Sequence, residues 1–322
     1  MNFIKLSICI ATYNIENYIG ECLDSLYKYL EFPEFEIIIV DDCSTDNTAD
    51  KIKNRILEHP DTTVIFEKNK KNSWPWPTYN NAIKLARWEF ITFIDWDDFL
   101  IKNTFQNKLE FFKKNKNLKV VYWNGIFYEK KTFWLEVQPN LEKLYWGSVD
   151  KTLELMYTTI PVLIVSTTVL KRDFIEKIWW FDDRINSNDW ILNIKIWNNL
   201  NNINEVKFDK DPCFWYRIHD NNISKDQKRM LKLLSEVIEK YHPDKYKKIA
   251  YSNAYFFVSL NLILQNKIKE SFGYFKQSIK YKKSIKRILL YIVSIITPSK
   301  LIQKIPYNLS TKIKKFIQKY FQ

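Results

Sequence analysis

Glycine is scarce in this sequence. The chain of 322 residues has 4 glycines, whereas average usage of about 7% would give roughly 22. Glycine normally serves tight turns and the places where a backbone approaches a phosphate. The sequence also has no glycine-rich, basic phosphate loop, which a nucleotidyltransferase would normally present.

Cysteines and long apolar runs are also few. Cys9, Cys22, Cys43 and Cys213 have no metal-like spacing, so we expect free, mostly buried thiols in a reducing cytoplasm. The longest apolar stretch, residues 288–297, is too short to span a bilayer. The first residues lack a small-residue cleavage site and are typical of a strand, not of a signal peptide. The sequence therefore predicts a cytoplasmic protein.

Acidic residues are almost absent from the C-terminal quarter. Residues 245–322 hold 17 Lys and Arg against one acid, Glu270, which gives +16, whereas the rest of the chain carries −3. Such a basic region fits an anionic membrane surface or a nucleic acid. Because the body has no basic groove and the tail has no recognition motif, we expect no nucleic-acid partner.

The end of the chain has the pattern of a basic amphipathic helix. Ile313, Phe316, Ile317, Tyr320 and Phe321 follow one another at i, i+3, i+4, i+7 and i+8, with lysines at other positions. A helix of this kind lies in a membrane interface. The pattern predicts contact with the inner membrane surface. The alternative is a solvated helical cap packed on the rest of the protein.

Strand and helix patterns alternate along the first 125 residues. Apolar runs typical of strands occur at 6–11, 35–40, 63–67, 90–95 and 119–124, and helical patterns occur at 17–30, 44–58, 78–86 and 103–115. Repeated β-α-β units predict an α/β fold with a doubly wound, mainly parallel sheet and helices on both faces. Ligands of such sheets bind beyond the carboxyl ends of the strands.

The pattern loosens in the second half of the chain. We expect, in order, a hairpin at 126–138, a helix near 149–157, an extended segment at 161–170, a helix at 171–178 and a strand running into a loop at 213–224. From residue 228 onward the sequence is typical of helices alone. The chain is therefore predicted to hold an α/β domain over residues 1–227 and a basic, all-helical C-terminal extension over residues 228–322.

Carboxylates follow two of the predicted strands. Asp41 and Asp42 end the second strand, and Asp95, Asp97 and Asp98 follow the fourth. Because the carboxyl ends of parallel strands meet at one edge, we expect these acids to lie close together. The D-x-D spacing suits a divalent cation such as Mg²⁺, which takes one or two carboxylates plus substrate phosphates. The alternative role for Asp98 is a helix cap, which is also the role expected for Asp46.

Five blocks of sequence resemble one known family. They read "SICIATYNIENYI", "IIIVDDCSTDNT", "AIKLARWEFITFIDWDDFL", "WWFDDRINSNDW" and "YRIHDNNIS", and they cover roughly residues 4–224 in this order. Together they resemble the inverting glycosyltransferases of family 2, of the bacterial cell-surface glycan type, whose fold is called GT-A. The resemblance implies a nucleotide-sugar part at about 1–125 and an acceptor part at about 126–227.

The resemblance also implies a role for each matching residue. The nucleotide of the donor would contact Thr12, Tyr13, Asn14, Glu16, Asp41, Asp42 and Asp95, with Asp42 reading the base. Asp97 and Asp95 would meet the metal-bound diphosphate, His219 would complete the metal site, and Asp98 adjoins them. Asp189 matches the catalytic base. The implied cofactor is a divalent cation, Mg²⁺ or Mn²⁺.

The implied reaction moves a sugar from a nucleotide-sugar donor to a glycan or lipid-linked saccharide acceptor. The acceptor hydroxyl needs a positioned base, which a carboxylate can supply, and a cation stabilises the leaving diphosphate. Direct displacement inverts the anomeric carbon, so no cysteine nucleophile is required. The basic tail would hold the enzyme as a peripheral protein at the cytoplasmic face of the inner membrane. The alternatives are a nucleotide-sugar-binding protein without transfer activity and a nucleotidyltransferase.

Tryptophan is abundant where glycine is scarce. Six of the 12 tryptophans stand where family members have glycine, namely Trp74, Trp76, Trp88, Trp96, Trp179 and Trp180. Read with glycine, "ARWEF" and "DWDD" become "ARGEF" and "DGDD", which are ordinary strings of the family. We interpret these residues as misdecoded glycine codons, since some bacterial lineages translate UGA as glycine. The alternative is a truly tryptophan-rich protein whose indoles stack on sugars.

Overall fold

The chain forms two compact units. The computed structural model describes residues 5–30, 34–101, 105–129, 132–136, 147–159, 164–178, 180–185, 188–219 and 225–296. One unit comprises residues 1–151 and 162–219, and the other comprises residues 152–161 and 220–322. Each unit has its own hydrophobic core and is described by itself.

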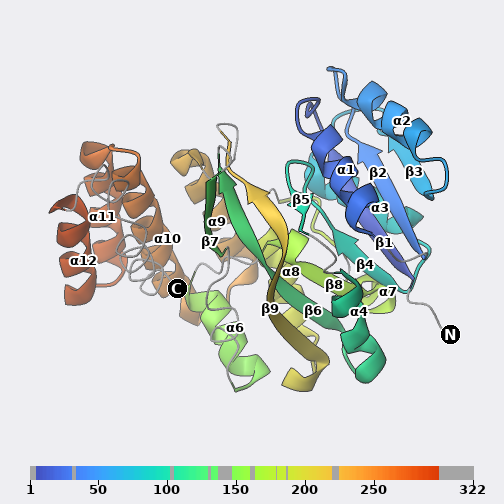
Figure 1. Cartoon of the computed structure of the whole chain (residues 1–322). Coiled ribbons are helices and arrows are strands. Elements are labelled where there is room, and N and C mark those ends of the chain that lie inside the picture. The colour runs from blue at the N-terminus through green and yellow to red at the C-terminus, as the bar shows by residue number, and fades with distance from the viewer. Residues whose placement is uncertain are drawn as a thin grey trace. The chain divides into compact units, whose positions relative to one another are not determined.

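Four parallel strands form the first half of the sheet in the first unit. They are β1 (Leu6–Thr12), β2 (Phe35–Asp41), β3 (Val64–Lys68) and β4 (Phe90–Phe93), in the order β3-β2-β1-β4 (Figure 1). Every residue of β1 and β4 is buried, which explains their continuous apolar sequences. Thr12 pairs with Asp41 in the register of β1 and β2. The two strands therefore end side by side, as the sequence predicted.

The second half of the sheet is mixed. Strand β8 (Thr168–Lys171) lies antiparallel between β4 and β6 (Val120–Glu129). Strand β9 (Val206–Arg217) runs parallel to β6 and antiparallel to the short β5 (Phe99–Leu100), and β7 (Thr132–Glu136) pairs with β6. The predicted α/β class with a mainly parallel sheet is confirmed. The position of β8 was not predicted, because strand order depends on packing between distant segments.

Helices lie between the strands along the chain. They are α1 (Ile19–Tyr29), α2 (Thr48–Glu58), α3 (Pro75–Leu85), α4 (Phe105–Lys114), α6 (Val149–Thr158), α7 (Arg172–Lys177) and α8 (Asn188–Asn198). Helix α1 buries Ile19, Cys22, Leu23 and Leu26 in the core of the first unit. The N-cap residue of helix α2 is Asn47, one residue after the predicted Asp46, whose carboxylate accepts the Thr48 N–H at 3.0 Å.

The cysteines follow the prediction of free thiols. Cys9, Cys22 and Cys213 are buried, Cys43 is partly exposed, and none forms a disulfide in the described chain. Burial raises the pKa of the Cys9 and Cys22 thiols. These thiols are therefore protonated side chains of the core, and Cys9 itself lies within β1.

The second unit is helical. Among the described residues its helices are α9 (Gln227–Tyr241), α10 (Asp244–Leu264), α11 (Ile268–Tyr281) and α12 (Ile285–Ile296), and residues 152–158 of α6 also belong to it. A core of Phe256, Leu260, Ile263, Phe275 and Tyr291 joins α10, α11 and α12. Among the described residues, no helix is both long and apolar enough to cross a membrane. The amphipathic segment predicted near residues 313–321 lies outside the described residues.

Candidate active site

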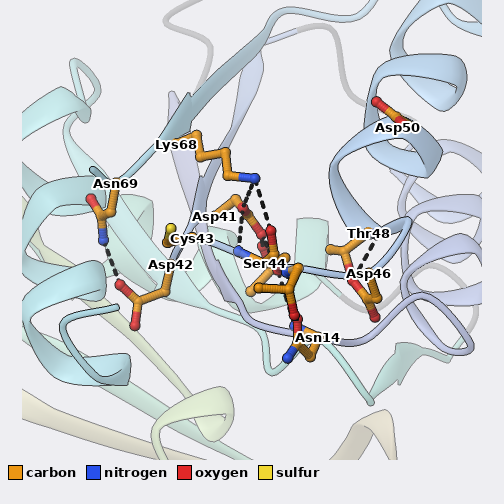
Figure 2. Close-up of polar contacts among 12 residues, drawn as sticks. Asn14, Asp41, Asp42, Cys43, Ser44, Asp46, Thr48, Asp50, Lys68 and Asn69 are labelled. Carbon is orange, nitrogen blue, oxygen red and sulfur yellow. Dashed lines mark hydrogen bonds and ion pairs between the residues drawn. The ribbon is translucent and has the colours of Figure 1, made fainter. Parts of the chain in front are cut away.

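Asp41 lies at the end of β2, fully buried and surrounded by donors. Its carboxylate accepts hydrogen bonds from the Thr12 hydroxyl at 3.1 Å and from the Ser44 N–H at 3.0 Å. The Ser44 hydroxyl also donates to it, and the Lys68 ammonium lies 3.6 Å away (Figure 2). Asp41 is buried and its hydrogen-bonding capacity is used within the protein. It therefore stabilises the ends of β1 and β2 and the loop after β2.

Asp42 faces the segment before α3. One of its oxygens accepts the Asn69 amide at 2.8 Å (Figure 2), and both accept the Ser73 N–H at 2.9 and 3.0 Å. The same Asn69 amide donates to the Thr78 hydroxyl at 3.0 Å, and Thr78 belongs to α3. Asp42 therefore fixes the approach of α3 to the carboxyl edge of the sheet.

The loop after β1 lies against the loop after β2. The Asn14 side chain accepts the Thr45 N–H at 2.9 Å, and the Glu16 carboxylate accepts the Asn47 N–H at 3.2 Å. Asn14 has φ 50°, a left-handed conformation that asparagine tolerates better than most residues. Tyr13, which precedes Asn14, is 43% exposed. The predicted nucleotide-contacting residues after β1 thus share one edge with Asp41 and Asp42.

Asp95 follows β4 and is held by two hydroxyls. Tyr79 of α3 donates to one of its oxygens at 2.9 Å, and Ser166 donates to the other at 2.8 Å. Burial, followed by the nearby negative charge of Asp97, raises the pKa of Asp95 to about 6. Tyr79 and Ser166 lower it in part by stabilising the carboxylate.

Asp97 and Asp98 contact the end of β9. The Asp97 carboxylate lies 2.9 Å from Nε2 of His219. Asp98 accepts the backbone N–H of Arg217 at 3.0 Å, and the Arg217 guanidinium donates to the Asp97 carbonyl at 2.7 Å. Burial, followed by the charges of Asp97 and Asp95, raises the pKa of Asp98. Asp98 therefore anchors the D-x-D turn to β9 and does not cap α4.

Asp189 lies in the first turn of α8. One of its oxygens accepts the Val165 N–H at 3.1 Å, and Val165 is next to the Ser166 that binds Asp95. Burial, followed by the negative charge of Asp95, raises the pKa of Asp189 to about 7. A carboxylate with this pKa can accept a proton near neutral pH.

The donor set at this edge is suited to a hard divalent cation. Asp97 and His219 offer adjacent oxygen and nitrogen ligands, and one oxygen of buried Asp98 has no hydrogen-bond partner among the described residues. Mg²⁺ commonly takes one or two protein carboxylates and completes its shell with water and substrate phosphates. Within the described ranges, no three such side chains are already arranged around a common point. The residues fit a cation that binds together with a diphosphate.

Comparison with known proteins identifies the family. Residues 7–179 match the domain described as Glycosyl transferase family 2. The chain belongs to this family. It is 29% identical to the poly(ribitol-phosphate) beta-N-acetylglucosaminyltransferase TarS of Staphylococcus aureus over 224 residues, which is 66% of this chain and 35% of TarS. It is 31% identical over 177 residues to a poly(ribitol-phosphate) beta-glucosyltransferase of Bacillus spizizenii, covering 53% of this chain and 26% of that protein. The chain thus spans about a third or less of the length of these curated relatives.

Two solved structures show the same GT-A fold. S. aureus TarS 1–349 in complex with UDP-GlcNAc has a TM-score of 0.58 at 20% identity, over 94% of this chain and 92% of that one. The mannosyltransferase PcManGT of Pyrobaculum calidifontis, in complex with GDP-Man and Mn²⁺, has a TM-score of 0.59 at 17% identity, over 98% and 85%. At these identities the likeness concerns the fold.

Several residues of this family 2 domain surround the acids without having been singled out from the sequence. Tyr79 and Ser166 bind Asp95, Asn69 binds Asp42, and Arg217 holds the D-x-D turn. Arg217 lies inside one of the sequence blocks that resemble the family, and Tyr79 lies just before another. Their positions therefore gave a weak indication that they belong to the site. Ser166 lies in a loosely patterned segment, and only the pairing of β8 with β4 brings it to Asp95.

The backbone distinguishes among the six tryptophans that occupy glycine positions of the family. Trp74 has φ 76° and ψ 163°, and Trp180 has φ 43°. The first of these conformations is essentially restricted to glycine. Trp76, Trp88 and Trp96 have no positive φ, so the backbone does not demand glycine there, and Trp179 lies outside the described residues. The glycine interpretation is thus supported by geometry at Trp74 and Trp180.

Proposed function

We propose that the protein transfers a sugar from a nucleotide-sugar donor to a glycan or lipid-linked acceptor with inversion, using Asp189 as base and a divalent cation at the donor diphosphate. The observation that carries the proposal is the position of Asp189. It is a partly buried carboxylate whose pKa desolvation raises to about 7, and it accepts a hydrogen bond from Val165, the neighbour of the Ser166 that binds Asp95. This arrangement supports the role of Asp189 as the proton acceptor, because its hydrogen-bond partner Val165 adjoins the Ser166 that binds Asp95 after β4.

The donor nucleotide is proposed to lie along the ends of β1, β2 and β4. Thr12 at the end of β1 would line it together with Tyr13, Asn14 and Glu16 of the loop that follows, and Asp42 would read the base. Asp41, which is satisfied internally, would hold the loops in place. The proposal is supported by two structural neighbours, TarS in complex with UDP-GlcNAc and PcManGT in complex with GDP-Man.

The divalent cation is proposed to be held by Asp97 and His219, with Asp95 beside them and Asp98 adjoining. When bound, it would stabilise the charge that develops on the leaving nucleoside diphosphate as a Lewis acid. Arg217 donates hydrogen bonds to the Asp97 carbonyl and to the Asp98 carboxylate, so both aspartates are positioned before the donor binds. The Mn²⁺ ion in the complex of PcManGT with GDP-Man supports this assignment.

The acceptor is proposed to be a glycan or lipid-linked saccharide at the cytoplasmic face of the inner membrane. Relatives are named for transfer to poly(ribitol phosphate) and, in Escherichia coli WfaP, to a diphosphoundecaprenol-linked sugar. Because the chain covers about a third or less of the first relatives, their acceptors indicate a chemical class only. The basic C-terminal region would keep the enzyme at the surface where such acceptors lie.

A donor screen tests this function. The full chain is incubated with nucleotide sugars, Mg²⁺ or Mn²⁺ and lipid-linked or polyol-phosphate acceptors, and released nucleoside diphosphate is measured. We expect Asp189→Asn to lower turnover by about 10²–10⁴-fold while leaving donor binding within a factor of about two. Asp173→Asn is the matched control, because Asp173 is an exposed aspartate in the first turn of α7. Donor binding without turnover in the unaltered chain would indicate a binding protein instead, and transfer of the nucleotidyl group would indicate a nucleotidyltransferase.

A further inference from the structure

A cavity lined by lysines lies in the second unit, apart from the site described above. Its volume is about 560 Å³, and its lining includes Ile249 and Tyr281 together with five lysines. The lysines are Lys245 and Lys248 of α10, Lys280 of α11, and Lys282 and Lys283 of the turn before α12. No acidic side chain is among the described residues that line it.

The positive charge of this cavity is not neutralised within the described helices. None of the five lysines forms an ion pair with a described carboxylate. Asp244 and Glu239 are bound by Lys247 instead, at 2.9 and 3.4 Å. Five like charges around one space repel one another unless an anion lies between them. The cavity is therefore suited to phosphate groups.

Helix α12 begins two residues after the cavity-lining Lys283, and one of its sides packs on α10 and α11. Tyr291 stacks on Phe275 of α11 with ring centroids 3.9 Å apart, and its hydroxyl lies 3.1 Å from the Ser271 hydroxyl. Arg287 donates to the Ser252 hydroxyl and to the Asn253 side chain, both on α10. These contacts fix which side of α12 faces the unit and which side faces away.

The outer side of α12 is an exposed apolar stripe. Ile285, Ile288, Leu289, Ile292 and Val293 are 79%, 39%, 57%, 45% and 52% exposed. They follow the i, i+3, i+4, i+7, i+8 pattern of one helix face. The helix has 12 residues, so it is about 18 Å long and far too short to span a hydrocarbon core of about 30 Å. It is long enough to lie within a membrane interface.

Charge distinguishes among the three partners that could pack against this stripe, namely a second copy of the chain, residues 297–322 and a lipid surface. A second copy of the chain would bring two lysine clusters together. Residues 297–322 contain six lysines and no acid, so this segment would add to the repulsion. An anionic lipid surface supplies hydrocarbon for the stripe and phosphate for the cavity in one layer.

We propose that the second unit docks on anionic lipid bilayers, with the exposed stripe of α12 in the interface and the lysine cavity around lipid phosphate groups. The docking surface consists of described helices and is separate from the sequence pattern near residues 313–321. It rests on the membrane contact of the proposed function and names the surface that makes it, but it does not depend on transfer activity, so loss of vesicle binding and loss of transfer are measured separately.

Flotation of the full chain with lipid vesicles tests the proposal. Vesicles of phosphatidylcholine with and without phosphatidylglycerol are used, and we expect binding to the anionic vesicles only, weakened by salt. The stripe variant Ile288→Glu with Ile292→Glu and the cavity variant Lys280→Glu with Lys283→Glu should each lower the partition coefficient at least tenfold. Leu57→Glu and Lys53→Glu on α2 are matched controls, because both side chains are exposed in the first unit. Unchanged thermal unfolding of each variant shows that it is folded.

Four outcomes would overturn the proposal. The first is a stripe or cavity variant that binds anionic vesicles like the unaltered chain. The second is a stripe variant that dissociates a dimer in light scattering without changing vesicle binding, since a second copy would then be the cover. The third is loss of binding in the variant Lys312→Glu with Lys315→Glu and in neither the stripe nor the cavity variant. That result would assign the membrane contact to the terminal segment. The fourth is release by inorganic phosphate beyond that caused by NaCl of equal ionic strength, because the cavity would then bind free phosphate.

Discussion

At the residue scale, Trp74 combines a large side chain with a backbone conformation that belongs to glycine. It lies at φ 76° and ψ 163° immediately before α3, with its side chain 51% exposed. Its backbone carbonyl accepts the Thr78 hydroxyl at 2.9 Å, and its N–H donates to Asn72. Both contacts belong to the main chain. These two hydrogen bonds do not require an indole side chain, so glycine at this position could keep both of them and relieve the backbone strain.

Trp74→Gly should stabilise the first unit. Relief of backbone strain is worth about 1–3 kcal/mol, and the greater freedom of glycine in the unfolded chain offsets about 1 kcal/mol of it. We expect a net gain of about 1 kcal/mol, or a melting temperature higher by about 2–4 °C. Thermal unfolding followed by tryptophan fluorescence measures this change.

Trp76→Gly is the control for that substitution. Trp76 lies inside α3, and its ring contacts Phe181 and Tyr79 with centroids 5.1 and 6.0 Å apart. Its removal should destabilise the unit by about 1–2 kcal/mol through lost packing and helix propensity. A Trp74→Gly protein that melts below the unaltered chain, or UGG codons at positions 74 and 180 of the gene, would contradict the glycine interpretation.

Asp189 makes turnover depend on pH. Burial and the charge of Asp95 raise its pKa to about 7, and only the deprotonated carboxylate can accept the hydroxyl proton. Turnover should therefore fall about tenfold for each pH unit below about 7 and level off above it. Asp173→Asn should keep this profile. A profile that is flat between about pH 5 and pH 7 would exclude Asp189 as the base.

At the element scale, β9 decides the geometry of the D-x-D turn. Its pairing with β5 brings Phe99 opposite Trp215, and the chain then continues to Arg217 and His219. The Arg217 guanidinium also lies 4.9 Å from the Phe99 ring centroid and 5.4 Å from that of Tyr18. Arg217, the last residue of β9, therefore positions Asp97, and His219, two residues further on, supplies the nitrogen that lies beside it.

Replacing His219 at the end of β9 should weaken cation binding. If Asp97 and His219 hold the ion, His219→Gln should lower the affinity for Mn²⁺ in the presence of a nucleoside diphosphate by about 10–100-fold. Calorimetric titration with Mn²⁺ measures this. His59→Gln is the control, because His59 follows α2 and stacks on Tyr27. Equal Mn²⁺ affinity in the two variants would remove His219 from the metal site.

At the scale of the whole molecule, the two units should respond to pH in opposite directions. In the first unit, Asp95 and Asp189 have folded pKa values of about 6 and about 7, above the ordinary value of 3.8. The native state then binds protons that the unfolded chain does not, so its stability rises as pH falls from 7 toward 4. In the second unit, burial lowers the pKa of His242 from 6.5 to about 4. There the unfolded chain binds the proton, and stability falls over the same range.

Thermal unfolding at two pH values should separate these effects. All 12 tryptophans lie before residue 216, in the first unit. Tryptophan fluorescence therefore reports the first unit, whereas helical circular dichroism also reports the second. Without divalent cations, we expect the second unit to lose about 2 kcal/mol between pH 7 and pH 5 through His242, while the fluorescence transition does not fall. His242→Gln should abolish the loss. A parallel decline of both signals in the unaltered chain would contradict this assignment.

The sequence by itself determined the parts of the protein that depend on local patterns. Continuous, predominantly apolar runs gave β1, β2 and β4, because strands buried on both faces do not show the apolar–polar alternation of a half-exposed strand. The rule for parallel strands then placed Asp41, Asp42 and Asp95 at one edge. The helices of the second unit followed from their periodicity.

Only the tertiary structure decided what surrounds the acids and which surfaces stay uncovered. Ser166 reaches Asp95 because β8 inserts beside β4, and Arg217 reaches Asp98 because β9 pairs with β5. These pairings join residues 71 and 119 positions apart. No local pattern encodes such contacts, because their stability comes from packing of the whole sheet. The same holds for α12, where contacts with α10 and α11 select the apolar side that faces outward.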